Sequence, residues 1–303
     1  MPGTATNARL LPVACAVFLC CLLSVPAESS AQGDLFRARQ AVRSGGGGGG
    51  HGGGAGGKDD DHHHHGHWDD CDDDDGFFDE LFAELFTHLV VKPVCYVATS
   101  PFWGPYRTFD QGYNVPGHFY HHPYDRGGDG IMQIGGYDRP ENHLTRFDVE
   151  YAMDFDDLER VGGQVLWEHT NRFGVDASVN FFQEKFAAIT DDRLWIGDAN
   201  LVYRFAQCET FVMRAGVGVN WLADESRGDA GFNFTYGADW FPAEPFVVST
   251  AIDYGTLGDA MLFHGRATVG VVHDHVEFYT GYDYYDIDGV GLGTVIAGLR
   301  VWF

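Results

Sequence analysis

The sequence predicts an all-β fold, an antiparallel up-and-down transmembrane β-barrel of about ten strands, within residues 144–303. Three observations predict it. About ten segments alternate apolar with polar or small residues over about 9–11 residues each, which is the length of a tilted strand that crosses a bilayer. Tryptophans and tyrosines gather near the segment ends. The chain ends on an amphipathic segment whose last residue is Phe303.

Composition limits the remaining possibilities. The chain has 303 residues, 45% of them hydrophobic, and a formal net charge of −25. Such hydrophobic content excludes wholesale disorder. The strong acidity repels phosphate backbones, so no nucleic-acid partner is expected. After the first 30 residues no apolar run reaches the length of about 18 residues that a membrane-spanning helix requires.

Residues 1–31 are predicted to be a secretory signal peptide. Arg9 precedes an apolar run over residues 10–23, and small residues allow cleavage after Ala27 or Ala31. A retained membrane anchor is the alternative. The signal indicates export, so the protein is expected to mature in an oxidising compartment.

Three cysteines lie beyond the signal segment, which leaves one possible disulfide and one free thiol. A bond from Cys71 to Cys95 would join the ends of a short helix. A bond from Cys95 to Cys208 would join the middle of the chain to its C-terminal half. The spacing does not choose between them.

Residues 32–75 are predicted to be a disordered low-complexity linker. Its glycine-rich part, residues 44–57, is almost pure glycine and has no means of burying a core. A tract of histidines and aspartates follows. No cofactor is expected, although imidazoles suit Zn²⁺, Cu²⁺ or Ni²⁺. The favoured interpretation of this tract is a solvated charged run, and weak divalent metal binding is the alternative hypothesis; its histidines are His62, His63, His64, His65 and His67.

Two segments separate the linker from the barrel. Residues 76–91 are predicted to contain an amphipathic helix, because apolar residues recur at i, i+3 and i+4 over residues 77–89 and acids begin it. Its phenylalanine-rich face is expected to pack on this chain; binding to a periplasmic partner or to a membrane surface is the alternative. Residues 92–143 are rich in Pro, Gly and aromatic residues and are predicted to be irregular, with a short strand at residues 131–134.

The predicted strands are placed by period-2 alternation. They run over residues 144–155, 160–169, 172–183, 193–205, 209–222, 231–241, 246–254, 261–272, 275–285 and 290–303.

Charged side chains share one parity along these strands, which means that they lie at every second position and therefore on one face. No charge is expected on the other, apolar face. The predicted lumen charge network comprises Arg146, Asp148, Glu150, Glu168, Asp176, Asp198, Arg204, Arg214, Asp239, Asp253, His264, Arg266, Glu277, Asp283 and Arg300. The parity alone fits a membrane barrel with a polar interior or a soluble barrel with an apolar one. The aromatic strand ends favour the membrane barrel, as do short connections that alternate with longer ones.

The signal and residues 144–303 resemble the outer-membrane β-barrel proteins of double-membraned bacteria. In that family a C-terminal phenylalanine in an alternating last strand is read by the assembly machinery, a role implied here for Phe303, Val301 and Leu299. The resemblance implies two partners, the lipid bilayer and the assembly machinery. It also implies an outer-membrane location, with the N-terminal extension in the periplasm.

A barrel of about ten strands is narrow enough for side chains to fill. We therefore expect a structural or anchoring protein with an internal ion-pair network, or a narrow cation-preferring pore, and no enzymatic activity. A soluble exported barrel that binds a small ligand is an alternative. A barrel hydrolase that uses His264 is the least favoured one.

Overall fold

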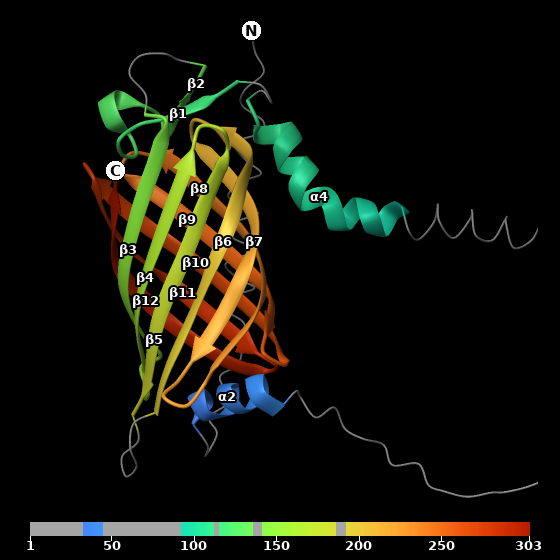
Figure 1. Ribbon diagram of the computed structural model, residues 1–303. Coiled ribbons are helices and arrows are strands. Elements are labelled where there is room, and N and C mark those ends of the chain that lie inside the picture. Colours follow the sequence, from blue (N-terminus) through green and yellow to red (C-terminus); the bar gives the residue numbers. More distant parts are fainter. Residues whose placement is uncertain (1–32, 45–91, 112–114, 136–140, 186–191) are drawn as a thin grey trace, which may run out of the picture. The chain divides into compact units, whose positions relative to one another are not determined.

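The structure, a computed structural model, describes residues 33–44, 92–111, 115–135, 141–185 and 192–303. Ten antiparallel strands form a closed barrel (Figure 1). The strands are β3 His143–Met153, β4 Leu158–His169, β5 Phe173–Glu184, β6 Asp192–Cys208, β7 Phe211–Ala223, β8 Gly228–Ala243, β9 Phe246–Leu257, β10 Ala260–His273, β11 Val276–Ile287 and β12 Val290–Trp302.

The barrel has an up-and-down topology, because each strand pairs with its neighbours in sequence and β12 closes the sheet against β3. Val301 lies opposite Phe147 in that closing pair. The register shifts between Arg204 and Ala206 and between Trp240 and Ala243. The predicted fold class and strand number are confirmed. The predicted strand ends differ by a few residues, because pairing continues into the polar rims where alternation fades.

The two faces of the strands meet very different surroundings. Val149 is 63% exposed on the outside of β3, whereas the next residue, Glu150, is 5% exposed inside the barrel. The same contrast holds on β7, where Val217 is 51% exposed and Arg214 is 6% exposed. The barrel therefore has an apolar exterior and a polar interior, the reverse of a water-soluble barrel.

The expectation that the apolar face carries no charge is wrong at one rim. Glu159, Arg193 and Asp286 have the outward parity of their strands. All three lie near strand ends, where a polar partner or water is within reach. Glu159, for example, accepts a hydrogen bond of 2.5 Å from Lys185 Nζ. The uncharged exterior is thus a belt between the rims.

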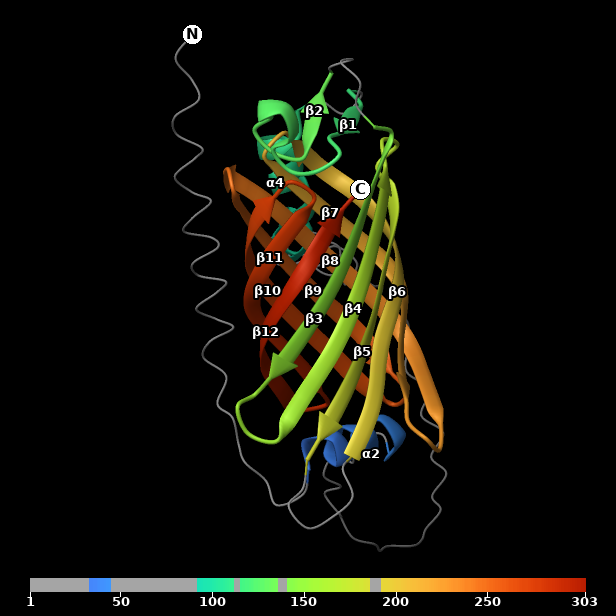
Figure 2. The same ribbon diagram turned by 90° about the vertical axis from the view of Figure 1, so that its left-hand side faces the viewer.

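A helix, α2 (Asp34–Ser44), lies within the segment predicted to be a disordered linker, so that prediction is wrong for these 11 residues. Leu35, Ala38 and Val42 are fully buried on one face of the helix. Figures 1 and 2 show α2 across the mouth of the barrel opposite the C-terminus. The apolar positions are few and stand among arginines beside a glycine run, so the sequence pattern was too short to indicate a docked helix.

The buried face of α2 completes an apolar layer at this mouth. Inward side chains from the strand ends make up the rest of the layer: Leu158, Phe182, Leu194, Ile196, Leu222, Leu257, Ala260, Leu262, Tyr285, Ile287, Val290 and Leu292.

A small hairpin lies at the other mouth. Its strands are β1 (Gly117–Phe119) and β2 (Met132–Ile134), with the 3₁₀ turn η3 (Asp125–Gly127) between them. Thus the short strand predicted at residues 131–134 is confirmed. Its backbone lies against the β6–β7 turn, where the Ile131 N–H donates to the Glu209 carbonyl at 3.2 Å. Its apolar side chains cover a second apolar layer that contains Phe119, Tyr124, Ile131, Met132, Leu144, Val212, Phe241, Val247, Val272 and Trp302.

A second helix, α4 (Lys92–Phe109), corrects the prediction of irregular structure over residues 92–143. Pro101 and Pro105 lie inside it, and these prolines suggested a break. Proline removes one backbone donor but does not prevent helical turns on either side. None of the helices that the structure describes is long and apolar enough to cross a membrane. The signal peptide and the helix predicted at residues 76–91 lie outside the described residues.

The packing of α2 predicts unequal effects for two adjacent side chains. Leu35 is fully buried and Phe36 is 47% exposed. Leu35→Ala removes a core side chain, a loss that costs about 2–5 kcal/mol in well-packed sites. We expect it to raise amide hydrogen exchange throughout α2, while Phe36→Ala leaves exchange close to the wild-type rate. Equal exchange in the two variants would show that α2 does not depend on this layer.

Candidate functional site

The barrel interior between the two apolar layers is polar and charged, and we call it the interior network. In the described strands it contains six arginines, one histidine and nine carboxylates. They are Arg146, Arg160, Arg204, Arg214, Arg266, Arg300 and His264, with Asp148, Glu150, Glu168, Asp176, Asp198, Asp239, Asp253, Glu277 and Asp283.

Arg300 of β12 is the centre of one part of the network. Its Nε lies 3.0 Å from both carboxylate oxygens of Asp148 on the adjacent β3. Its Nη1 donates to Glu277 at 2.9 Å and to the Ser249 hydroxyl at 3.1 Å. Trp302 Nε1 donates to the other oxygen of Glu277 at 3.1 Å. One arginine thus satisfies two buried carboxylates from neighbouring strands.

A chain of alternating charges continues toward the hairpin mouth. Arg214 reaches Asp239 at 2.5 Å and Glu168 at 3.2 Å. Glu168 also accepts from Arg204 at 3.3 Å, and Arg146 contacts Asp239 at the same distance. Each carboxylate here bridges two arginines, so removal of one member leaves a charge without its partner in a dry site.

A third group surrounds Glu150 nearer the other mouth. Glu150 accepts hydrogen bonds from Arg266 Nη1 and from the Tyr279 hydroxyl, each at 2.8 Å, and forms an ion pair with Arg160 Nη2 at the same distance. The same Arg160 nitrogen lies 2.9 Å from Asp283. Arg160 is absent from the network predicted from the sequence. Its position on the strand indicates it, because Arg160 lies on the same face as Gln164 and Glu168.

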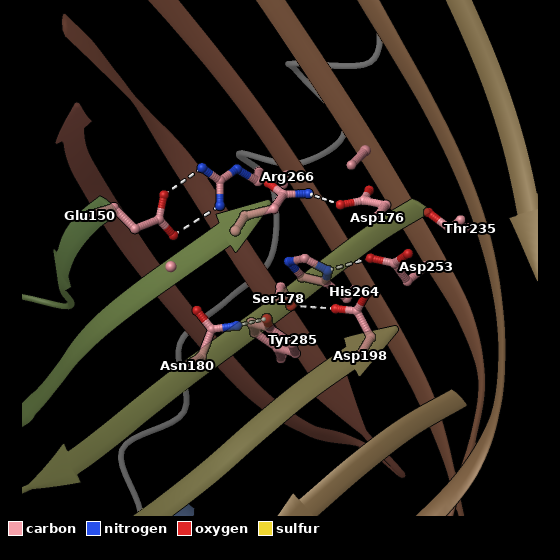
Figure 3. Close-up of a pocket in the computed structure, with 13 residues that line it drawn as sticks. Glu150, Asp176, Ser178, Asn180, Asp198, Thr235, Asp253, His264, Arg266 and Tyr285 are labelled. Atoms are coloured by element: carbon pink, nitrogen blue, oxygen red, sulfur yellow. Dashed lines mark hydrogen bonds and ion pairs between the residues drawn. The ribbon is translucent and has the colours of Figure 1, made fainter. Parts of the chain in front are cut away.

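His264 lies between two carboxylates of this region, Asp253, which Figure 3 shows, and Asp283. Its Nδ1 is 2.6 Å from Asp253 and its Nε2 is 2.8 Å from Asp283. The ring also stacks on Tyr285, with centroids 4.1 Å apart. Both ring nitrogens are thus engaged, and the histidine serves as a crosslink between strands.

Two of the carboxylates, Asp176 and Asp198, accept hydrogen bonds from neutral groups instead of forming a close ion pair with an arginine. Asp176 accepts from Gln164 Nε2 at 2.8 Å, and Asp198 accepts from the Ser178 hydroxyl (Figure 3). Asp198 also accepts from Asn200 Nδ2 at 2.6 Å. These bonds bring the surplus acids into the same network without an added cation.

Two small cavities remain inside the network, each of about 30 Å³. Asp176 and Gln164 border both, His264 borders one and Arg300 the other. This volume admits one or two water molecules. Around these cavities the described side chains fill the lumen.

All fifteen residues predicted for the network point into the barrel and belong to the interior network. Leu299 and Phe303 lie on the outside, 46% and 57% exposed, and Val301 shares their face. The Phe303 ring packs edge-on against Phe147, with centroids 5.9 Å apart. Their assembly role stays a prediction.

The metal site and one of the two disulfide alternatives stay untested. The metal-binding hypothesis concerns the histidine tract of residues 62–67, and the first disulfide alternative involves Cys71; both lie outside the described residues. The second alternative, Cys95 to Cys208, is not formed, because Cys208 is a free thiol. Cys208 Sγ lies 3.8 Å from the Thr210 hydroxyl. Within the described ranges, no group of three or more His, Cys, Asp or Glu side chains is arranged to hold a metal ion.

No family model and no curated protein matches this chain. Among solved structures, it is similar to the N-terminal β-barrel domain of Pseudomonas aeruginosa OprF, with 10% identity and a TM-score of 0.28, over 54% of this chain and 98% of that one. The Yersinia pestis outer-membrane protein Ail has 16% identity and a TM-score of 0.31, over 53% of this chain and 99% of that one. Neisserial surface protein A has 15% identity and a TM-score of 0.27, over 54% of this chain and 98% of that one. Similarities this weak do not assign a function to this chain.

The network predicts that Arg300 matters far more to stability than a rim arginine. Arg300→Leu leaves Asp148 and Glu277 buried without their cation, a change that costs about 3–5 kcal/mol. Arg227→Leu is the control, because its side chain is 58% exposed and contacts Asp229 at the rim. We expect that control to cost less than about 1 kcal/mol. Urea unfolding of detergent-folded protein measures both, and equal midpoints would contradict the network's role.

Proposed function

We propose that this protein is an outer-membrane β-barrel with a filled lumen, which serves as a structural or anchoring protein of the bacterial envelope. The observation that carries the proposal is the inverted distribution of polarity. Large apolar side chains are exposed on the barrel exterior, while the charged groups of the same strands are buried inside.

An exterior of this kind is unstable in water. Val149, Leu201, Val217, Val219 and Phe278 are each more than half exposed. Apolar surface costs about 25 cal/mol per Å² when it stays in contact with water, and contiguous patches this extensive are rare on soluble monomers. A bilayer removes that cost. A soluble barrel that binds a ligand requires a polar exterior and an apolar interior, so this alternative is disfavoured.

The length of the strands and the placement of aromatic side chains also support a lipid bilayer around the barrel. The strands have 11 to 17 residues, sufficient for a tilted crossing with some residues left at the rims. Toward one rim Phe173 packs on Tyr203, with centroids 5.2 Å apart. Toward the other Phe181 packs on Trp195, with centroids 4.8 Å apart. Such aromatic pairs suit the interfaces between lipid and water.

The lumen favours a structural role over a conduit. The surplus of carboxylates over arginines is what would favour cations in a pore. However, the cavities measure only about 30 Å³ each, and apolar layers with α2 and the hairpin cover the two mouths. Ions need a continuous water-filled path through the lumen, and packed side chains interrupt such a path here.

A hydrolase role for His264 is disfavoured by its position. The ring lies inside the barrel, with both nitrogens next to aspartates and one face on Tyr285. A general base must reach the proton that it removes from a substrate. In this arrangement the histidine faces protein groups instead, which supports a protein without catalytic activity.

The C-terminal strand suits recognition during membrane assembly. Leu299, Val301 and Phe303 form one outward apolar row at the end of β12, the strand that closes the barrel. We propose this row as the segment that the assembly machinery reads. Membrane fractionation and heat-dependent gel mobility test the location, and a protein that stays soluble without detergent would overturn it.

A lipid-facing exterior predicts intolerance of charge in the belt. Val217→Arg and Val269→Arg place a cation near the middle of the outward face, where both valines are about half exposed. We expect a cost of about 2–4 kcal/mol and poor assembly. Glu225→Arg in the exposed β7–β8 turn is the control and should assemble normally. Folded yield, measured by heat-dependent mobility, compares the three; equal yields would argue against lipid contact.

The filled lumen also predicts electrical silence. Purified protein in planar bilayers is expected to produce no discrete conductance steps, because the interior network leaves no continuous water path. A folded porin prepared in the same way serves as the positive control. Reproducible cation-selective steps from the wild-type protein would contradict the structural proposal and support the pore.

A further inference from the structure

The chain joins the barrel at a fixed point on the rim of the hairpin mouth, just after α4. Arg172 of the β4–β5 turn donates from Nη1 and Nη2 to the two carboxylate oxygens of Asp110, at 3.0 and 3.4 Å. Asp110 also accepts the backbone N–H of Gln207 at 3.2 Å, and the Gln111 N–H donates to the Gln207 carbonyl at 3.0 Å. The C-terminal end of α4 is therefore held at the end of β6 and the β4–β5 turn.

The last residue of α4 lies on the outer wall of the barrel. Phe109 packs on Phe211 of β7, with ring centroids 4.9 Å apart. Phe211 and Met213 have the outward parity of β7, yet they are only 8% and 9% exposed, whereas Val217 on the same face is 51% exposed. The chain thus passes over the exterior rim before it reaches the mouth, and it covers part of the apolar wall there.

This part of the outer wall is aromatic. Phe205, Tyr236 and Trp240 pack, partly buried, in the same cluster as Phe109 and Phe211. The rings of Phe205 and Tyr236 have centroids 5.6 Å apart. In membrane barrels such aromatic side chains gather where the hydrocarbon meets the lipid headgroups. In the proposed bilayer, the end of α4 is therefore fixed at the level of the lipid–water boundary.

Residues 99–109 of α4 are amphipathic. Phe102, Tyr106 and Phe109 are spaced at i, i+4 and i+7, so they share one face of the helix. The opposite face carries small and polar residues, namely Ser100, Gly104, Arg107 and Thr108. A Cβ on Gly104 would meet no atom of the described residues within 4 Å, so a side chain fits there freely. Helices with two such faces suit the plane of a membrane interface.

Charge and proline content favour the headgroup region over the hydrocarbon. The 18 residues of α4 include two basic residues, Lys92 and Arg107, and no acidic one, which favours anionic headgroups. The Arg107 guanidinium lies 5.3 Å from the centroid of the Trp103 ring, so a cation and an amphipathic ring flank the apolar face. Pro101 and Pro105 leave earlier carbonyls without a helical donor. Water among the headgroups meets that need, and hydrocarbon does not.

We propose that α4 is an interfacial helix that lies on a phospholipid surface beside the barrel, in the leaflet nearer the hairpin mouth. This rests on the proposed outer-membrane location. Phe102 and Tyr106 face the acyl chains, while Arg107 faces the headgroup phosphates. A helix of 18 residues is about 27 Å long, so the contact extends well beyond the barrel wall. The barrel would thus have a second, lateral anchor that fixes its depth in the membrane.

Depth-dependent fluorescence quenching tests the contact. The full chain, with its native cysteines replaced by serine, is placed in nanodiscs of phosphatidylethanolamine and phosphatidylglycerol that carry spin labels on the headgroup or within the acyl chain. A fluorophore is attached at Tyr106→Cys on the apolar face of α4 or at Ser100→Cys on the polar face. We expect the headgroup label to quench the first at least twice as strongly as the second.

Two further sites separate this proposal from the proposed function. Val217→Cys lies in the lipid-facing belt and should be quenched mainly by the acyl-chain label, while Glu225→Cys in the exposed β7–β8 turn is the aqueous reference. If Tyr106→Cys is quenched no more than Ser100→Cys while Val217→Cys is still quenched, the interfacial helix is overturned and the barrel's location stands. If neither lipid label quenches Val217→Cys, the proposed function is overturned instead.

Trypsin cleavage after Arg107 provides a second test that needs no fluorophore. Phe102→Glu places an acid on the face that contacts lipid, so we expect it to speed cleavage in the same nanodiscs at least fivefold. Gly104→Glu adds the same acid on the opposite, open face and should stay within about twofold of the wild-type rate. The mass of the released fragment identifies the cleavage site. Equal rates in the two variants would overturn the lipid contact.

Discussion

The cost of burying charge governs this structure. The interior of a narrow barrel is dry, and an arginine there is tolerated only beside carboxylates that meet its hydrogen-bonding groups. Arg300 meets that condition between Asp148 and Glu277, and Arg214 meets it between Glu168 and Asp239. Because each pair joins different strands, the geometry of the barrel and the pairing of charges depend on each other.

The same constraint explains the apolar layers. The attraction between paired charges is strong in a medium of low dielectric constant and weakens when water enters. Here Trp302 and Phe119 belong to the layer at one mouth, and Leu35 and Phe182 belong to the layer at the other. The hairpin and α2 cover these layers, so two elements outside the barrel sequence keep its interior dry. A filled and sealed interior supports the proposed structural role over transport.

Much of the fold could be predicted from residue order. Alternation located ten strands because side-chain direction in a strand has a period of two, which is a local property. The same parity assigned residues such as Asp148 and Arg266 to one face. Helix α2 escaped prediction because its three buried side chains, Leu35, Ala38 and Val42, have meaning only beside the barrel mouth. In α4, the prolines concealed a helix that local rules disfavour.

The sequence by itself determined the number of strands, their alternation and the separation of charged from apolar faces, since these follow from neighbours along the chain. Only the tertiary structure decided which face points outward, because parity is equally satisfied by a soluble and an inverted barrel. It also decided which charges meet, such as Arg160 with both Glu150 and Asp283. Partners this far apart in sequence are brought together by closure of the barrel, and no local pattern specifies them.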